Sequence, residues 1–438
     1  MSYLVQPKQG EELNRLHKED MPIHEWYRFV LSFPPHLVRH YIEKFNLSKH
    51  HWVLDPFCGT GTTLVECKKN GISSVGFETN PMVQFAAQTK VSWNLDPDEL
   101  VSDAKRVAKA ALGTLKKEGV EDDPLFQPLA DGKSLNLRAL DNERERLLIK
   151  DSISPIPLHK ALVLVENLDN MADRCFVLHE KTALAKQLVY TISNLRFGPE
   201  VGIGKIKENA PVVAPWLMGV KEIADDLRQP LIKRHKGIPA FVKLSDARSL
   251  DASLEPLAFD AVITSPPYPN EKDYTRTTRL ESVLLGFMNN LEDLRRHKQK
   301  LLRSNTRAVY KTDTDELWIE NNERVQELAN KIESRRIELG KTSGFEKLYA
   351  RVVRLYFGGM ARHLEELKRV LVPGAQLAYV VGDQASYFRI MIRTGEIISA
   401  IAKDLGYETV GIDLFRTRFS TVTQEHLREE VVLLRWNG

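Results

Sequence analysis

The chain has 438 residues, which is long for one ordinary core and predicts a domain of typical size with substantial insertions or a second domain. Hydrophobic residues make up 42% and charged residues 28%, a balance that excludes disordered, collagen-like and membrane proteins. The formal net charge of +3 indicates a nucleic-acid partner only if basic residues cluster locally.

The N-terminal segment is polar where a secretory signal would be apolar, and no run of about 18 apolar residues follows it. We therefore expect a cytoplasmic protein that does not enter a membrane. Three cysteines, Cys58, Cys67 and Cys175, show neither an even disulfide set nor a CxxC metal pattern. Reduced thiols and no metal site are expected.

The first informative pattern, at 51–71, is an apolar run followed by a glycine-rich turn and a helical period, so it predicts strand, loop and helix. A second unit follows, with an apolar run at 73–78 that ends in Glu78 and a helix-like segment from Pro81. Two such units in succession predict a parallel, doubly wound sheet.

Two helical insertions are predicted to interrupt this sheet. The first spans 97–238 and ends in an irregular stretch at 196–213, and the second runs from about 277 to 370. Strand character marks the sheet itself at 240–250, at 259–270 and, after a Pro-Gly break, at 373–383. After a helix near 390–405, the runs 407–419 and 428–436 are predicted to pair as an antiparallel edge hairpin.

The glycine-rich turn Asp55–Gly61 stands at the carboxyl end of the first strand, where doubly wound sheets bind ligands. A dinucleotide fingerprint lacks its third glycine here because Leu64 occupies that place, and no lysine follows as a phosphate-binding loop requires. Glu78, 23 residues after Asp55, can accept hydrogen bonds from ribose hydroxyls, or it only caps the next helix. A nucleoside without a pyrophosphate fits this pattern best.

A third loop, Ser245–Arg248, can place Asp246 on the exocyclic amine of an adenine, or Asp246 is a helix N-cap. Cys58 is expected to pack or to contact the cofactor rather than to act as a nucleophile. The expected cofactor contacts are Asp55, Pro56, Phe57, Cys58, Gly59, Gly61, Thr62, Thr63, Glu78, Asn80, Asp246 and Ala247.

The sharpest feature is the loop Thr264-Ser265-Pro266-Pro267-Tyr268 after an apolar strand. Two prolines fix the backbone and remove two donors, so the loop can be rigid and direct carbonyl oxygens outward. An aromatic amine is a poor nucleophile, and acceptors such as Ser265 Oγ and the Pro266 carbonyl would hold its hydrogens while Tyr268 stacks on the base. The alternative is an ordinary turn at the end of a strand.

These two loops, Phe57-Cys58-Gly59-Thr60-Gly61 and Ser265-Pro266-Pro267-Tyr268, resemble the FxGxG and [DNS]PP[YFW] motifs of the amino-methylating DNA methyltransferases. The resemblance implies an α/β, Rossmann-like class I methyltransferase fold with a seven-stranded, mostly parallel sheet and one antiparallel strand near the C-terminus. It also implies S-adenosylmethionine as cofactor, and it marks Ser265, Pro266, Pro267 and Tyr268 as the catalytic residues.

The same resemblance implies a DNA duplex whose target base is flipped out of the stack. In this family the serine form of the second loop goes mainly with cytosine N4 and the aspartate form with adenine N6. Cytosine N4 is therefore the expected target. Adenine N6, an RNA base amine and a non-catalytic DNA-binding subunit stay as alternatives.

The resemblance also divides the chain. Residues 1–95 and 240–276 carry the two loops, 371–438 completes the sheet, and either insertion, 96–239 or 277–370, can read the target. The segment 29–45, with Phe33 and Pro34, looks like the family's lid over the methionine part of the cofactor. A cognate restriction endonuclease is a possible partner, and the oligomeric state is left open.

A basic run from Arg295 to Arg307 has no acidic interruption and suits phosphate contact beside the catalytic loop, although such runs are often solvated helix faces. The glycines within 196–205 are a second candidate for close DNA approach. The expected DNA contacts are Arg276, Arg279, Arg295, Arg296, Lys298, Lys300, Arg303 and Arg307.

Overall fold

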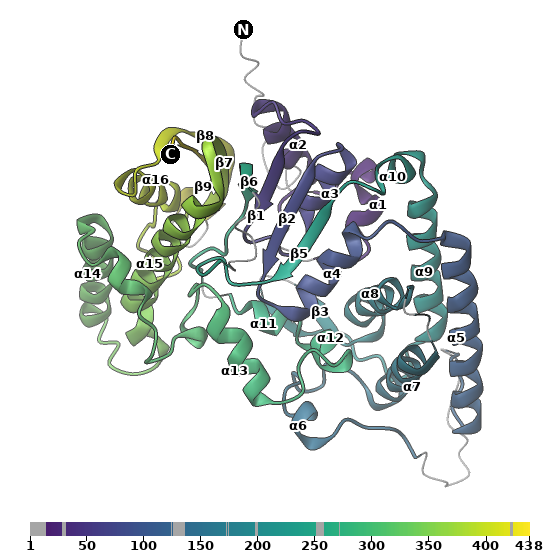
Figure 1. Ribbon diagram of the computed structural model, residues 1–438. Coiled ribbons are helices and arrows are strands. Elements are labelled where there is room, and N and C mark those ends of the chain that lie inside the picture. Colours follow the sequence, from purple (N-terminus) through teal and green to yellow (C-terminus); the bar gives the residue numbers. More distant parts are fainter. Residues whose placement is uncertain are drawn as a thin grey trace.

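The computed structural model describes residues 15–28, 32–123, 125, 136–171, 173, 175–197, 200–250, 258–270, 272–420 and 424–438. A seven-stranded sheet with the order β5-β2-β1-β6-β7-β9-β8 forms its centre (Figure 1). The strands are β1 (Trp52–Asp55), β2 (Ser73–Glu78), β5 (Ala240–Leu244), β6 (Phe259–Thr264), β7 (Leu371–Gly382), β8 (Glu408–Ser420) and β9 (Glu425–Trp436). Among the described strands of this sheet, β9 pairs antiparallel with both β7 and β8 and the other pairs are parallel, which confirms the predicted mostly parallel α/β sheet and its terminal hairpin.

Successive strand side chains point to opposite faces of the sheet, and helices cover both faces. Leu54 and Val262 face the group that includes α15 (Tyr349–Leu367) and α16 (Thr394–Asp404). The adjacent residues Val53 and Ala261 face the group that includes α2 (Pro35–Lys44) and α3 (Thr62–Lys69). These two central strands are therefore apolar on both sides, as expected inside a parallel sheet whose faces are both covered.

The order in which successive strands are added to the sheet reverses beside β1. From β1 the chain adds β2 and then β5 on one side, whereas β6 and β7 extend the sheet on the other side. Ligands of doubly wound sheets bind at the carboxyl ends of the strands where the order reverses. The residues that follow β1 and β6, in the two predicted loops, therefore meet at one edge.

The first insertion is a group of helices beside the β5 end of the sheet (Figure 1). Its helix α5 begins where the Asp96 carboxylate accepts hydrogen bonds from the Asp98 and Glu99 N–H groups. The buried Trp216 packs within the apolar cluster that these helices share with α3 and α4. Its helices are α5 (Pro97–Lys117), α6 (Asn142–Glu145), α7 (Pro155–Met171), α8 (Val177–Gln187), α9 (Val213–Arg228) and α10 (Pro230–His235), and α4 (Pro81–Val91) precedes it.

Two expectations about local structure were wrong. The stretch from 196 is not wholly irregular, because β3 (Leu195–Phe197) and β4 (Val201–Ile203) form an antiparallel pair, while Gly198 and Pro199 lie outside the described residues. The Pro373-Gly374 pair does not precede β7 but lies inside it. There it forms a bulge, with Phe259 opposite Leu371 and Ala261 opposite Gln376.

The second insertion passes below the carboxyl ends of the strands and then along the far side of β7 (Figure 1). Its helices are α11 (Tyr274–Thr277), α12 (Arg279–Leu284), α13 (Leu291–Lys300) and α14 (Glu323–Glu338), and it leads into α15. None of the helices in the described part of the chain is both long and apolar enough to cross a membrane.

Candidate active site

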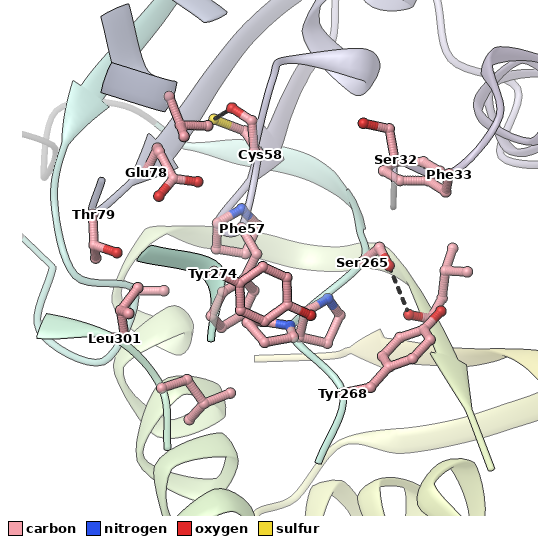
Figure 2. A pocket seen from close by; sticks show the side chains of 18 of the residues that line it. Ser32, Phe33, Phe57, Cys58, Glu78, Thr79, Ser265, Tyr268, Tyr274 and Leu301 are labelled. Carbon is pink, nitrogen blue, oxygen red and sulfur yellow. Dashed lines mark hydrogen bonds between the residues drawn. The ribbon is translucent and has the colours of Figure 1, made fainter. Parts of the chain in front are cut away.

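A cavity of about 300 Å³ opens at the carboxyl ends of β1, β2, β5 and β6. The two loops predicted from the sequence line it together: Cys58 and Glu78 stand on one side, and Ser265 and Tyr268 on the other (Figure 2). Ser32 and Phe33 add a wall before α2, while Pro34 is buried beside them and does not line the cavity, so the expected lid over the cofactor stays a prediction.

The glycine-rich turn contains two glycines in the left-handed backbone conformation, and their structural roles differ. Gly59 has φ +50° and Gly61 has φ +83°. A Cβ at Gly61 would lie 3.3 Å from the Ala87 Cβ, so that glycine serves helix packing. A Cβ at Gly59 would meet no atom within 4 Å, and this residue lines the cavity, so the loop backbone is open to a ligand there.

Asp55 ties the two central strands together beneath the loops. Its carboxylate accepts a hydrogen bond of 2.6 Å from the Thr264 hydroxyl and one of 3.2 Å from the Phe57 N–H. Burial raises the pKa of this carboxyl to about 6, and these hydrogen bonds oppose the rise. Asp55 is fully buried and does not line the cavity, so the structure does not support its expected contact with the cofactor, which stays a prediction.

Glu78 ends β2 and directs its carboxylate into the cavity (Figure 2). One of its oxygens accepts the Asn80 N–H at 2.8 Å, and burial raises the pKa of the carboxyl to about 7. The N-cap of α4 is Asn80, whose side-chain oxygen accepts the Met82 N–H at 3.1 Å. Asn80 therefore caps α4, and the Glu78 carboxylate lines the cavity.

The second loop presents Ser265 and Tyr268 to the cavity (Figure 2). The Ser265 hydroxyl donates to the Val380 carbonyl at 3.2 Å. The Tyr268 ring passes beside β7 at Gly382, where a Cβ would lie 3.0 Å from ring atom Cε2. Burial raises the pKa of the Tyr268 phenol, so the ring stays neutral at ordinary pH.

Cys58 has no nucleophile character in this environment. The side chain is 3% exposed and packs against β2, where a Cβ at Gly76 would lie 2.8 Å from the Cys58 sulfur. Burial raises the pKa of the thiol well above its usual range.

Two further members of the expected cofactor set do not line the cavity. Thr63 is fully buried and donates its hydroxyl to the Ile263 carbonyl at 3.1 Å, so it joins α3 to β6 instead. Gly61 serves the turn as described above. The cavity is lined by Pro56, Phe57, Cys58, Gly59, Thr62, Glu78, Asn80, Asp246 and Ala247, whose contact with a cofactor stays a prediction.

The glycine-loop side of the cavity suits a nucleoside without phosphates. The cavity wall beside Gly59 carries the carboxylates of Glu78 and Asp246, which accept hydrogen bonds from hydroxyl and amino groups. The cavity's cationic side chains, which would favour phosphate, come instead from the catalytic-loop side, the second insertion and the β8–β9 hairpin. The residues present therefore fit S-adenosylmethionine better than a nucleotide.

The expected basic surface divides into structural and available cations. Arg303 is 3% exposed and pairs with Asp313 at 2.7 Å, and Lys298 pairs with Asp273 at 2.8 Å. The guanidinium of Arg279 donates to Thr275 and to the Leu147 carbonyl. Donors of these three residues are used inside the protein, which does not favour the phosphate contacts expected of them; those contacts stay a prediction.

The remaining candidates keep their side chains accessible. Those of Arg295, Arg296, Lys300 and Arg307 are exposed, and that of Arg276 is half-buried. Lys300 alone among these five also lines the cavity. Their contact with DNA stays a prediction.

Three cations that line the cavity were not predicted from the sequence: Lys272, Arg416 and Arg418. Lys272 stands four residues after Tyr268 in the same loop, and this spacing was the available signal. Arg416 and Arg418 are two residues apart in β8, so they share a face of the predicted hairpin. Their place beside the catalytic loop depends on β9 inserting between β7 and β8.

Comparison with known proteins agrees with the motifs. The family model of N6 and N4 methyltransferases, described as DNA methylase, matches residues 5–88. Type II methyltransferase M.BsoBI of Geobacillus stearothermophilus is 26% identical over 95% of this chain and 85% of its own length. Type II methyltransferase M.AvaI of Nostoc sp. is 23% identical over 92% of this chain and 83% of its own length.

Among solved structures, an rRNA methyltransferase, aviRa from Streptomyces viridochromogenes, overlaps 96% of this chain and 94% of its own. The identity is 10% and the TM-score 0.33, too low to carry an argument.

Proposed function

Because this chain belongs to the amino-methylating DNA methyltransferases, we propose that it transfers a methyl group from S-adenosylmethionine to the N4 amino group of cytosine in double-stranded DNA. The observation that carries the proposal is the single cavity lined by both the Gly59 loop and the Ser265-Pro266-Pro267-Tyr268 loop. A cofactor on the first loop and a base on the second would meet inside it.

Ser265 is the residue that would orient the amine. Its hydroxyl hydrogen is directed to the Val380 carbonyl, so Oγ can accept a hydrogen bond from a substrate N–H. Holding the amino hydrogens in this way turns the nitrogen lone pair toward the methyl donor and favours the positive charge that develops on nitrogen. The Pro266 carbonyl would hold the second amino hydrogen.

Tyr268 would bind the face of the base. Its ring is held against β7 at Gly382 and stays neutral, as a stacking surface should. Glu78 would accept the ribose hydroxyls of the cofactor, and Asp246 its adenine amine. When bound, S-adenosylmethionine supplies an electrophilic methyl group.

A duplex substrate requires that the target base leave the stack, because its amino group is otherwise paired and out of reach. The exposed cations Lys300, Arg307 and Arg418 would bind the flanking phosphates. One or both insertions, 96–239 and 277–370, are predicted to read the target sequence. A cytoplasmic location and a partner endonuclease also stay predictions from the sequence.

Adenine N6 is the second candidate target, since the family uses related loops for both bases and only Ser265 favours cytosine. An RNA base amine and a non-catalytic DNA-binding role are further alternatives. Purified protein incubated with methyl-labelled S-adenosylmethionine and separate pools of DNA and RNA tests the class of substrate. We expect label in DNA, whereas label found only in RNA would refute the DNA assignment.

A further inference from the structure

A buried guanidinium bridges the loop after β5 and the second insertion. Arg248 donates to both carboxylate oxygens of Asp246, at 3.0 and 2.7 Å. It also donates to the Asp315 carboxylate at 2.5 Å, to the Lys300 carbonyl at 3.1 Å and to the Gln299 carbonyl at 3.4 Å. One side chain thus joins segments that are about 50 and 70 residues apart.

Both ends of this bridge reach the cavity. Asp246 and Ala247 form part of its cofactor-facing wall. On the other side, Lys300 and Leu302 line the same cavity, and the exposed Lys300 is one of the cations proposed to bind DNA phosphates. The walls for the two proposed ligands therefore share one set of hydrogen bonds.

The bridge has little freedom to relax. Arg248 is 5% exposed. Helix α15 has glycines at 358 and 359, where added Cβ atoms would collide with the Asp315 backbone and with the Leu302 side chain. These glycines let the short 3-10 helix Asp315–Ile319 approach α15 and present Asp315 to the guanidinium.

A second contact fixes the cofactor side of the bridge. In α15, the Nδ1 atom of His363 is 2.9 Å from the Ala247 carbonyl oxygen, and its Nε2 atom is 2.7 Å from the Tyr379 hydroxyl. The carbonyl can only accept, so Nδ1 donates, and Nε2 of the neutral ring accepts from Tyr379. The Phe57 ring packs on the same imidazole at 4.9 Å. A change in the loop after β5 is thereby passed to α15 as well as to Arg248.

We propose that Arg248 is a positioning residue that couples cofactor binding to DNA binding. This inference rests on the proposed function, because it takes the two ligands from there. Because the bridge is closely packed, a cofactor that holds Asp246 in place also holds the guanidinium and hence the Lys300–Leu302 wall, so DNA then meets a wall that is already positioned. Linkage requires the reverse effect of DNA on the cofactor to have the same size.

Binding of S-adenosylhomocysteine and of a duplex taken from DNA that the protein methylates tests this coupling. Each dissociation constant is measured with and without a saturating amount of the other ligand. In the wild type we expect each ligand to tighten the other by the same factor, at least about fivefold. Arg248→Lys keeps the charge but loses the planar fork, so we expect the factor to fall below about twofold.

Arg351→Lys is the matched control, because Arg351 bonds to Glu316 and to the Asp313 carbonyl, both inside the second insertion. Its coupling factor should equal that of the wild type. If Arg248→Lys does not fold, Asp315→Asn takes its place. This variant keeps the hydrogen bonds of the Arg248 guanidinium to Asp246 and weakens its contact with the second insertion at Asp315. That variant should lower the factor in both directions.

Two results would overturn the inference while leaving the proposed function intact: independent binding of the two ligands to the wild type, or full coupling in the folded Arg248→Lys protein. A wild-type protein that methylates no DNA would instead refute the proposed function, and the coupling with it.

Discussion

Ser265 carries the assignment of an amino target, and its hydrogen bond makes that role specific. The hydroxyl donates to the Val380 carbonyl, which leaves Oγ as an acceptor at the cavity wall. A serine hydroxyl does not titrate in the ordinary pH range, so Ser265 would orient the amine rather than act as a strong base.

Replacing Ser265 by alanine removes this acceptor and should leave the cofactor wall in place. We expect kcat to fall on the order of 10²-fold, the scale seen when one preorganised hydrogen bond at a reacting centre is removed. Steady-state methylation of DNA measures kcat, and calorimetry measures cofactor binding. Ser343→Ala, at an exposed position, is the control and should match the wild type.

The catalytic assignment of Ser265 fails if the alanine variant turns over at the wild-type rate. A loss of cofactor binding in that variant would point to a collapsed cavity instead. Circular dichroism separates that case from a catalytic defect.

Glu78 predicts how cofactor affinity depends on pH. Burial raises the pKa of its carboxyl to about 7, so the carboxylate that we propose as acceptor for the ribose hydroxyls predominates above that pH and is lost below it. Affinity for S-adenosylhomocysteine should therefore be highest near pH 8 and fall by up to roughly tenfold per pH unit below 7. Calorimetric titrations between pH 6 and 8 measure this.

Glu78→Gln is the matched control, because the amide keeps the shape and does not titrate. It should bind more weakly at pH 8, and its affinity should change little with pH. A pH-independent affinity in the wild type would contradict the assigned role of Glu78.

Individual site residues were predictable from the sequence where a motif determines both the residue type and its place at the end of a strand. Ser265 and Glu78 were predictable because Ser265 directly follows an apolar strand and Glu78 ends one, and such residues meet at one edge of a parallel sheet. Thr63 was misassigned because sequence adjacency to Gly61 says nothing about which way a helix side chain points. Arg418 was missed because its position depends on the register of β8 with β9.

Among the elements, the basic segment 295–307 shows how burial divides a run of like charges. Arg303 lies against Asp313 and over the Tyr310 ring, whereas Arg307 is exposed four residues later. The first fixes the fold of the insertion. The second is free to meet a phosphate.

Two alanine variants separate these roles. Arg303→Ala leaves the mostly buried Asp313 without its partner and should lower the free energy of unfolding by about 3 kcal/mol. Arg307→Ala should leave the melting temperature unchanged, weaken DNA binding and reduce the slope of log K against log salt by about 0.9. Thermal melts and salt titrations of DNA binding measure the two effects, and a destabilised Arg307→Ala protein would contradict the division.

Secondary structure was predictable where periodicity was strong and failed where turn chemistry decided. The terminal hairpin was predicted because both runs are apolar and strand-like. The Pro373-Gly374 pair was taken for a boundary, but Gly374 has φ +91° and the pair forms a bulge within β7. Likewise, the glycines near β4 hid a short strand pair.

For the whole molecule, the sheet followed from two strand-loop-helix units and the later strands that rejoin them. The packing of the insertions did not follow, because no local pattern reports contacts such as that of Arg248 with Asp315, which are 67 residues apart. Those contacts bring the second insertion to the cavity wall at Lys300 and Leu302. The cavity is thus formed by the sheet edge together with segments that the motifs do not reveal.

We propose that the protein transfers a methyl group from S-adenosylmethionine to cytosine N4 in the cavity between the two loops. Wild-type protein is incubated with DNA and deuterated-methyl S-adenosylmethionine, the DNA is digested to nucleosides, and the labelled nucleoside is identified by mass spectrometry. We expect labelled N4-methyldeoxycytidine, which should be lost in the Ser265→Ala variant. Labelled N6-methyldeoxyadenosine in place of the cytosine product would contradict it.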